Sequence, residues 1–360
     1  MKFYTSVLPY HGKLLVRGVN ADGSHKKYRL NYEPSLFIPV QKESKYKTLD
    51  GRNVDQVKFG SIVEAKKWIQ EYDNVTNFEY FGNTRYQYPY IADKFPGKVD
   101  WDINKIRILT IDIECESENG FPDPNLAEEP LISITVKDNI TKRILVFGMG
   151  NFVNDGEDVD YIKLATERDM IAKFTEYWNF YKPDVITGWN VKFFDIPYLM
   201  NRFKHLMGEE YISQFSPWGI VNESTALGLG YNRKENYYDL LGIATLDYLD
   251  LYRKHTFVRR ESYKLDYIGE VEVGETKNEN PYDTFKEFYS NDYQRFIEYN
   301  IQDVELVDKL EDKMKLIELH LTMAYEAKVN YQDVFGQVRM WDSIIFNHLK
   351  EKNVVVPAVV

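Results

Sequence analysis

Cysteine is nearly absent from the 360-residue chain, which has a single one at Cys115. One thiol cannot form an intrachain disulfide, and no cysteine or histidine cluster has the spacing of a zinc site. No stretch approaches the roughly 18 apolar residues of a membrane span, and the N-terminus has no apolar run of signal-peptide length. These absences predict a soluble protein of a reducing, cytoplasmic compartment, with no membrane partner.

Positive charge is in deficit, because 45 lysines and arginines face 56 aspartates and glutamates, for a net charge of −11. A simple electrostatic clamp on DNA is usually basic, so that class of protein is not indicated. An enzyme acting on a nucleic-acid end remains compatible, since metal ions can offset carboxylate charge and basic residues can line one groove. We interpret the abundant aromatic residues mainly as core packing, with a base-stacking surface as the alternative.

Residues 1–104 are predicted to form a smaller N-terminal α+β domain. Short apolar runs at 14–16 and 36–40 indicate strands. Apolar residues at helical spacing over Ser61–Tyr72 indicate a helix, with Ser61 as its N-cap. We interpret Tyr86–Trp101, which is rich in tyrosine, proline and aspartate, as a linker or docking loop.

A different pattern begins near residue 105. Ile106–Glu114 has the pattern of a buried strand. An alternation of strands and helices follows, which is typical of an α/β fold with helices on the faces of a mixed sheet. The further strands are predicted at 131–136, 144–147 and 184–189, and the helices at 166–181 and 195–207. We assign this second domain to residues 105–315.

The last part of the chain is predicted to be mostly helical. Residues 221–245 are irregular and indicate a hairpin or loop, after which helices are expected at 247–254, at 292–323 with a break near Leu316, and at 340–350. We expect the segment 316–360 to pack back on the N-terminal domain. Its apolar ending resembles a chain cut before its next structural element.

Asp112 and Glu114 stand at the end of the predicted strand 106–114. Side chains alternate across a strand, so these two carboxylates share one face. Two carboxylates on one face of an apolar sheet are costly to ionise. Either they reach solvent at the strand end, or they are hard oxygen ligands for Mg²⁺ or Mn²⁺.

Three further residues extend this acidic set. Asp195 begins a predicted helix two residues before Pro197, which is typical of an N-cap and also places it at the sheet edge. Tyr299 and Asp303 are four residues apart and share a helix face. They are either a half-buried tyrosine beside a solvated aspartate, or a metal ligand beside a phenol that orients a water. The order of the three segments favours one convergent acidic site.

These three segments resemble the three exonuclease motifs of family B DNA polymerases, in the DEDD superfamily with a ribonuclease-H-like fold. Tyr299 stands where some members of the superfamily have a histidine, so the chain resembles the tyrosine-bearing branch that is typical of proofreading domains. The resemblance is closer still to the replicative polymerases of T-even-type bacteriophages. The other segments that carry this similarity are Phe121–Pro124, Leu246–Lys254, Asp292–Asn300 and Trp341–Asn347.

The resemblance implies a 3′→5′ proofreading exonuclease acting on single-stranded DNA or a frayed primer 3′ end. It implies two divalent metal ions, Mg²⁺ or Mn²⁺, about 3.5–4 Å apart, with Tyr299 positioning the attacking water. The implied ligands are Asp112, Glu114, Asp195 and Asp303. The resemblance also implies that Phe121 packs on a terminal base, while Asn190 and Phe194 seat the frayed end.

The polymerase motifs Asp-x-x-Ser-Leu-Tyr-Pro-Ser and Asp-Thr-Asp do not occur in the sequence. We therefore expect DNA synthesis to need a palm, fingers and thumb region, from the same gene or a split subunit. The main alternative is a non-catalytic module that assists a separate polymerase by binding single strands, or RNA through its N-terminal domain. The others are a stand-alone exoribonuclease and an α/β domain with chance carboxylates.

Overall fold

The computed structural model describes residues 1–72, 75–117, 121–154, 156–227, 234–276, 281–282 and 284–358. They form two compact units, one of Met1–Asp102 together with His320–Val360 and one of Ile103–Leu319. No helix in the described ranges is long and apolar enough to cross a membrane.

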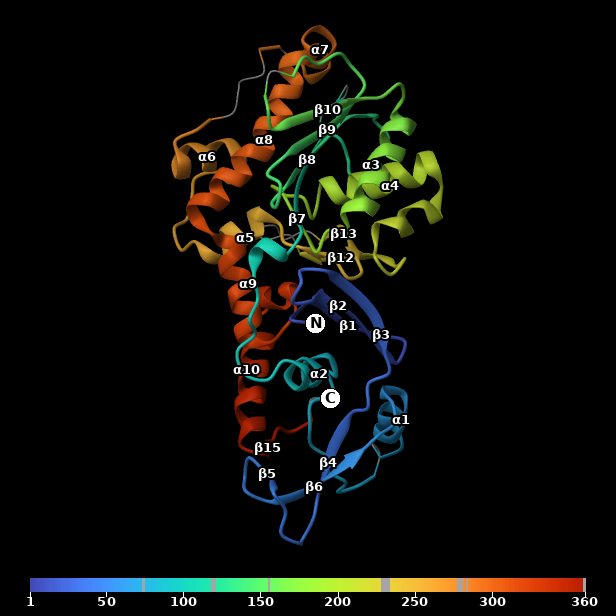
Figure 1. Cartoon of the computed structure of the whole chain (residues 1–360), viewed down its shortest axis with the longest axis vertical. Helices are drawn as coiled ribbons and strands as arrows, with labels where there is room; N and C mark the ends of the chain where they lie inside the picture. The colour runs from blue at the N-terminus through green and yellow to red at the C-terminus, as the bar shows by residue number, and fades with distance from the viewer. Residues whose placement is uncertain are drawn as a thin grey trace. The chain divides into compact units, whose positions relative to one another are not determined.

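The first unit contains two small sheets (Figure 1). One has the antiparallel order β1-β2-β3, from β1 (Phe3–Tyr10), β2 (Lys13–Val19) and β3 (His25–Leu30). The other has the order β15-β5-β6-β4, from β4 (Ser35–Pro39), β5 (Tyr46–Thr48), β6 (Asn53–Lys58) and β15 (Val354–Val355). The strands predicted at 14–16 and 36–40 are confirmed as β2 and β4.

The helix predicted over Ser61–Tyr72 is confirmed as α1 (Ile62–Tyr72). Ser61 Oγ accepts a hydrogen bond from the Glu64 amide at 3.1 Å, and Glu64 Oε2 accepts one from the Gly60 amide at 2.7 Å. Ser61 thus satisfies an amide that the first turn cannot pair internally, and Glu64 ties the residue before the N-cap to that turn, which is why the helix begins here.

The linker predicted at Tyr86–Trp101 is wrong in its first half, where helix α2 (Gln87–Lys94) forms. Pro89 is tolerated because it lies in the first helical turn, whose amides have no intrahelical partner. Tyr88, Tyr90 and Ile91 are buried. The tyrosines, taken as polar loop residues, bury their rings instead, and the Tyr90 and Tyr28 hydroxyls share a hydrogen bond of 2.7 Å.

The C-terminal segment joins the first unit through β1. It contains α9 (Leu316–Ala327), the 3₁₀ helix η3 (Tyr331–Phe335) and α10 (Gln337–Glu351), which confirms the helix predicted at 340–350. Asn330 Oδ1 accepts from the Val7 amide at 2.8 Å, and its Nδ2 donates to the Val7 carbonyl at 2.9 Å. Asn330 thus gives β1 the pairing that a neighbouring strand would provide.

The second unit is built on a six-stranded mixed sheet of order β10-β9-β8-β7-β11-β14 (Figure 1). Its strands are β7 (Ile108–Cys115), β8 (Leu131–Asp138), β9 (Ile144–Gly148), β10 (Val159–Lys163), β11 (Val185–Thr187) and β14 (Ala244–Thr245). Strand β8 runs antiparallel to both neighbours, and the other pairs are parallel. The predicted mixed α/β class is confirmed. Strands β10 and β14 were not predicted, because β10 is short and partly polar and β14 has only two residues.

Helices cover both faces of this sheet (Figure 1). Helices α3 (Glu167–Tyr181) and α4 (Asp195–Met207), both predicted, pack on one face over Ile111, Ile113 and Ile134. Helices α7 (Phe285–Asn291) and α8 (Tyr293–Met314) lie on the other, where Phe296 and Ile297 pack with Ile132 and Val146.

The remaining elements surround the sheet. Strands β12 (Val221–Leu227) and β13 (Lys234–Leu240) pair as the predicted hairpin, whose residues 228–233 lie outside the described residues. Helices α5 (Tyr248–His255) and α6 (Leu265–Val273) and the 3₁₀ helices η1 (Ile103–Lys105) and η2 (Glu209–Phe215) complete the set. The predicted break near Leu316 is confirmed, because Lys315 has a φ of 54° between α8 and α9.

Breaking the Arg202–Glu167 ion pair should destabilise the second unit. Arg202 Nε and Nη2 bind the two Glu167 oxygens at 2.8 and 2.7 Å, and Glu167 also accepts from the Leu131 amide. Both side chains are mostly buried. Glu167→Ala leaves a buried cation and an unpaired amide, so we expect a loss of about 3–5 kcal/mol.

The measurement is thermal unfolding followed by circular dichroism. Glu176→Ala is the matched control, because its pair with Lys173 at 2.8 Å is exposed and such pairs contribute about 0–1 kcal/mol. Equal shifts in the two variants would show that the Glu167 pair is not a stabilising contact.

Candidate active site

Strand β7 presents different chemistry on its two faces. Leu109, Ile111 and Ile113 face the apolar core under α3 and α4. The intervening Asp112 and Glu114 therefore point to the opposite face, as strand alternation requires. They pair in register with Thr135 and Ser133 of β8, so this face is polar on both strands. Helix α8 covers it.

Asn300 of α8, whose side chain is fully buried, contacts this polar face. Its Oδ1 accepts hydrogen bonds from the hydroxyls of Ser133, at 2.9 Å, and Thr135. Its Nδ2 donates to Asp112 Oδ2 at 2.6 Å. Because the hydroxyls occupy the amide oxygen, the amide nitrogen must face the carboxylate. Asn300 therefore orients the Asp112 carboxylate.

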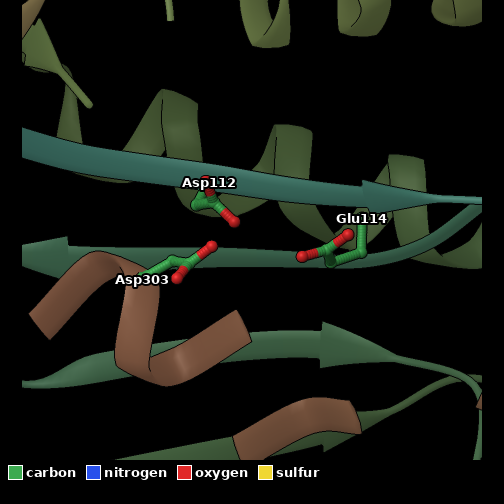
Figure 2. A group of neighbouring side chains, drawn as sticks. All are labelled: Asp112, Glu114 and Asp303. Atoms are coloured by element: carbon green, nitrogen blue, oxygen red, sulfur yellow. The ribbon is translucent and has the colours of Figure 1, made fainter. Parts of the chain in front are cut away.

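One helical turn further, α8 brings Asp303 to the carboxylates of β7. Figure 2 shows the side chains of Asp112, Glu114 and Asp303 pointing toward one another from the strand and the helix. One oxygen of each lies within 4.8 Å of the others, with Asp303 buried and the other two half-buried. The arrangement places three negative charges in one small volume, which is unfavourable unless a cation or protons offset them.

Asp195, the fourth predicted ligand, is not in this group of three. Its interpretation as an N-cap is wrong: Phe194 holds that position, and Asp195 is the first residue of α4. Strand β11 ends at Thr187, so the β7 edge beyond it needs another partner, and Asp195 Oδ1 accepts from the Ile113 amide at 3.1 Å. The side chain thus binds β7 between Asp112 and Glu114.

The electrostatic surroundings of Asp195 link it to the acidic group. Its side chain is almost completely buried. Burial raises the pKa of Asp195 above its ordinary value, the charges of Asp247 and Asp303 raise it further, and the Ile113 amide opposes the shift. Because the negative charge of Asp303 makes Asp195 harder to ionise, a cation nearby would favour the charged form of Asp195.

Tyr299 lies on α8 one turn before Asp303 and is half-buried. Its ring packs edge-on against Phe285 and Phe288 of the α7 region, with centroid distances of 5.9 and 6.1 Å. The structure therefore fixes the ring through aromatic contacts on one side.

The three predicted substrate contacts line one groove of about 490 Å³. We call it the aromatic groove. It is lined by Phe121, Asn190, Phe194, Lys234 and Asn236, among others. Phe121 is 83% exposed, and its ring lies 4.9 Å from that of Phe194. An exposed phenylalanine at the rim of a polar groove can stack on a planar ligand.

The loop that carries Asn190 is held by Asp247, a residue that the sequence analysis did not single out. Asp247 Oδ1 accepts hydrogen bonds from the backbone amides of Asn190 and Leu249 at 3.1 and 3.0 Å, and its Oδ2 accepts one from the backbone amide of Lys192 at 2.9 Å. Gly188 precedes this loop because a Cβ there would lie 2.4 Å from the Ile111 carbonyl. The loop between β11 and α4 is thereby fixed against β7 and α5.

The donor set of the acidic group fits a divalent metal ion. All its side-chain donors are carboxylate oxygens, the ligands that Mg²⁺ and Mn²⁺ prefer. Asp112 also has the hydrogen-bonded support that metal ligands usually have, since Asn300 donates to it. Fold and site together define an α/β protein with a group of carboxylates, at one face of its sheet, that could hold a metal ion.

A family model described as "DNA polymerase family B, exonuclease domain" matches residues 63–268. The chain belongs to this family, which confirms the resemblance inferred from the three motifs. The matched residues include Asp112, Glu114 and Asp195, while Tyr299 and Asp303 lie beyond them.

Similar curated proteins extend the match. The DNA-directed DNA polymerase of Escherichia phage RB69 is 33% identical over 99% of this chain and 42% of its own length. That of Enterobacteria phage T4 is 32% identical, with the same coverage. The DNA polymerase delta catalytic subunit of Schizosaccharomyces pombe is 25% identical over 73% of this chain and 25% of its own length. The chain thus spans less than half the length of the phage polymerases.

The supporting roles of Asn300 and Asp247 were not predicted, although the sequence around each residue contains an indication of its position. Asn300 is three residues before Asp303 and so shares its helix face. Asp247 directly precedes a predicted helix, which is typical of an N-cap. Neither signal reveals that the side chain reaches across to β7 or to the β11–α4 loop.

We predict that Asn300→Leu weakens Mn²⁺ binding to the free protein by about 10- to 100-fold, the usual effect of losing a residue that supports a metal ligand. The substitution removes the donor to Asp112 and leaves the Ser133 and Thr135 hydroxyls without their acceptor. Binding is measured by the electron paramagnetic resonance signal of free Mn²⁺, without DNA.

The matched control is Asn179→Leu, which makes the same chemical change at an exposed position of α3. It should bind Mn²⁺ as the parent does. Undiminished binding by folded Asn300→Leu protein would show that the amide does not position a ligand.

Proposed function

We propose that the chain is the 3′→5′ proofreading exonuclease portion of a phage-type replicative DNA polymerase. The observation that carries this proposal is the group Asp112, Glu114 and Asp303, whose oxygens lie within 4.8 Å of one another between β7 and α8. The chain that holds the group belongs to the family B exonuclease domain family. We infer a ribonuclease-H-like domain at 105–315, a polymerase N-terminal domain at 1–104 and a segment 316–360 that packs back on it.

In this proposal four carboxylates hold two divalent ions, Mg²⁺ or Mn²⁺. The ligands are Asp112, Glu114, Asp303 and Asp195, of which the last is anchored by the Ile113 amide. When bound, the ions activate a water and stabilise the charge that develops at the phosphodiester. Asn300 keeps Asp112 oriented, and Tyr299 orients the attacking water through its hydroxyl.

The aromatic groove receives the 3′ end. Phe121 stacks on the terminal base, and Asn190 and Phe194 seat the frayed nucleotide. Stacking contributes about 1–3 kcal/mol per base and tolerates any sequence, which suits an enzyme that removes every kind of nucleotide. Preference for mismatched ends then follows from easier melting, because a mispaired base costs less to unpair.

The phage relatives support the partners that we propose. The substrate is single-stranded DNA or a primer 3′ end, and the palm, fingers and thumb region works with this chain, in the same polypeptide or as a subunit. RNA is a second candidate ligand for the N-terminal domain. The phage relatives suggest the cytoplasm of an infected cell as the place of action.

We predict that the protein with Mg²⁺ or Mn²⁺ shortens 5′-labelled single-stranded DNA stepwise from its 3′ end. Asp112→Ala with Glu114→Ala should abolish this, because two ligands of the acidic group are lost. Denaturing gels measure product length, and circular dichroism checks that the variant is folded. Residual activity in the folded double variant would contradict the ligand assignment.

The control is Glu209→Ala with Glu210→Ala, which makes the same change in charge at two exposed positions of η2. It should cleave like the parent. Binding of DNA without metal-dependent cleavage would favour the non-catalytic module, and faster cleavage of a matched RNA would favour the exoribonuclease.

A further inference from the structure

A short basic segment stands out in this acidic chain. Residues 253–264 contain five lysines and arginines, one histidine and a single acidic residue, whereas the whole chain has a net charge of −11. The segment begins in the last turn of α5, crosses the α5–α6 connection and ends at Lys264, the N-cap of α6. We call residues 253–264 the basic segment.

The middle of the basic segment projects into solvent. Phe257 is 98% exposed and Val258 is 59% exposed, and Arg259 beside them is exposed as well. Leaving a phenylalanine so exposed forgoes the free energy that its burial would contribute. An aromatic ring flanked by cations is the combination that single-stranded nucleic acid uses, with a base on the ring and phosphates on the charges.

The ends of the segment are fixed, so the exposed tip is held in place. Arg260 binds the Tyr252 hydroxyl at 2.8 Å and Glu272 at 2.5 Å. Arg253 lies over the Tyr263 ring at 4.6 Å. These contacts engage two of the cations within the protein and leave Phe257 and Arg259 at the surface between them.

Hydrogen bonds also connect the basic segment to the aromatic groove. Trp189 Nε1 donates to the Tyr263 carbonyl at 3.1 Å, and Trp189 directly precedes Asn190, which lines the groove. Asp247, the N-cap of α5, binds the amides of Asn190 and Lys192. These hydrogen bonds therefore join α5 to the groove residue Asn190 at its N-terminal end and join Trp189, the neighbour of Asn190, to the basic segment that follows its C-terminal end.

We propose that the basic segment is a second subsite for single-stranded DNA. It binds the backbone of the strand upstream of the nucleotide in the aromatic groove, through Arg259 on a phosphate and Phe257 on a base. This subsite rests on the proposed exonuclease function, because the 3′ end must lie in the groove for the upstream strand to reach the segment.

The test measures binding of fluorescent oligothymidylates by anisotropy in EDTA, where no divalent ion is present to support cleavage. Phe257→Ala should weaken binding of a 12-nucleotide strand about 5- to 140-fold, the factor that corresponds to one lost stacking contact. The plot of log affinity against log salt has a negative slope. Arg259→Gln should make that slope less steep by about 0.7, the value for one phosphate on a single strand. Neither variant should alter binding of a dinucleotide.

Matched controls come from α3, where Phe180 is 82% exposed and Arg168 is exposed. Phe180→Ala and Arg168→Gln make the same changes away from the segment and should bind the 12-mer like the parent. Parental affinity and salt slope in the Phe257 and Arg259 variants would overturn the subsite. So would equal losses in the controls, or equal losses with the dinucleotide.

The experiment separates the two proposals. Failure of the proposed function appears as absent metal-dependent cleavage, while the anisotropy assay in EDTA still reports on the basic segment. An intact nuclease with unchanged 12-mer binding in both variants overturns the subsite alone. Binding of the parent to anionic phospholipid vesicles, lost in both variants while DNA binding persists, would assign the segment to a lipid surface and also overturn it.

Discussion

The site depends on the hydrogen bonds that the buried side-chain amide of Asn300 makes. A helix that packs on a sheet usually buries apolar side chains, yet here α8 buries an amide against two hydroxyls and a carboxylate. Buried polar groups are costly unless their hydrogen bonds are made, so the register of α8 on β7 and β8 is strongly specified. Because Asp303 is three residues further on, that register also delivers it to Asp112 and Glu114.

The opposite face of the sheet makes this arrangement rigid. Ile111 and Ile113 alternate with Asp112 and Glu114, and they are buried in the core beneath α3 and α4. A shift of β7 by one residue would exchange the apolar and acidic faces, which the apolar core opposes. Asp195 adds a tie at the strand edge, since it takes the Ile113 amide beyond the end of β11. The strand that carries two carboxylates is thus held from three directions.

Local patterns predicted much of this arrangement. The strand 106–114, the helix that begins at Asp195 and the shared helix face of Tyr299 and Asp303 all follow from periodicity, and the structure has each. Contacts across elements were not predictable. No local pattern shows that Asn300 reaches β8, or that Asp195 binds a strand amide instead of capping its own helix. Tyr88 and Tyr90 were misread because tyrosine suits both loops and cores, and only tertiary packing decides between them.

The distribution of charge reconciles an acidic chain with the nucleic-acid substrate that we propose for it. Net charge describes the field far from a protein, but a strand within a Debye length of about 8–10 Å responds to local charges. The carboxylates of the acidic group are the charges that divalent ions would neutralise, so they need not repel a bound strand. Cations gathered in residues 253–264 add attraction beside the loop that carries Asn190. For the exonuclease that we propose, a few local contacts keep binding of the strand weaker than a uniformly basic surface would, because affinity rises with the number of phosphates that are neutralised.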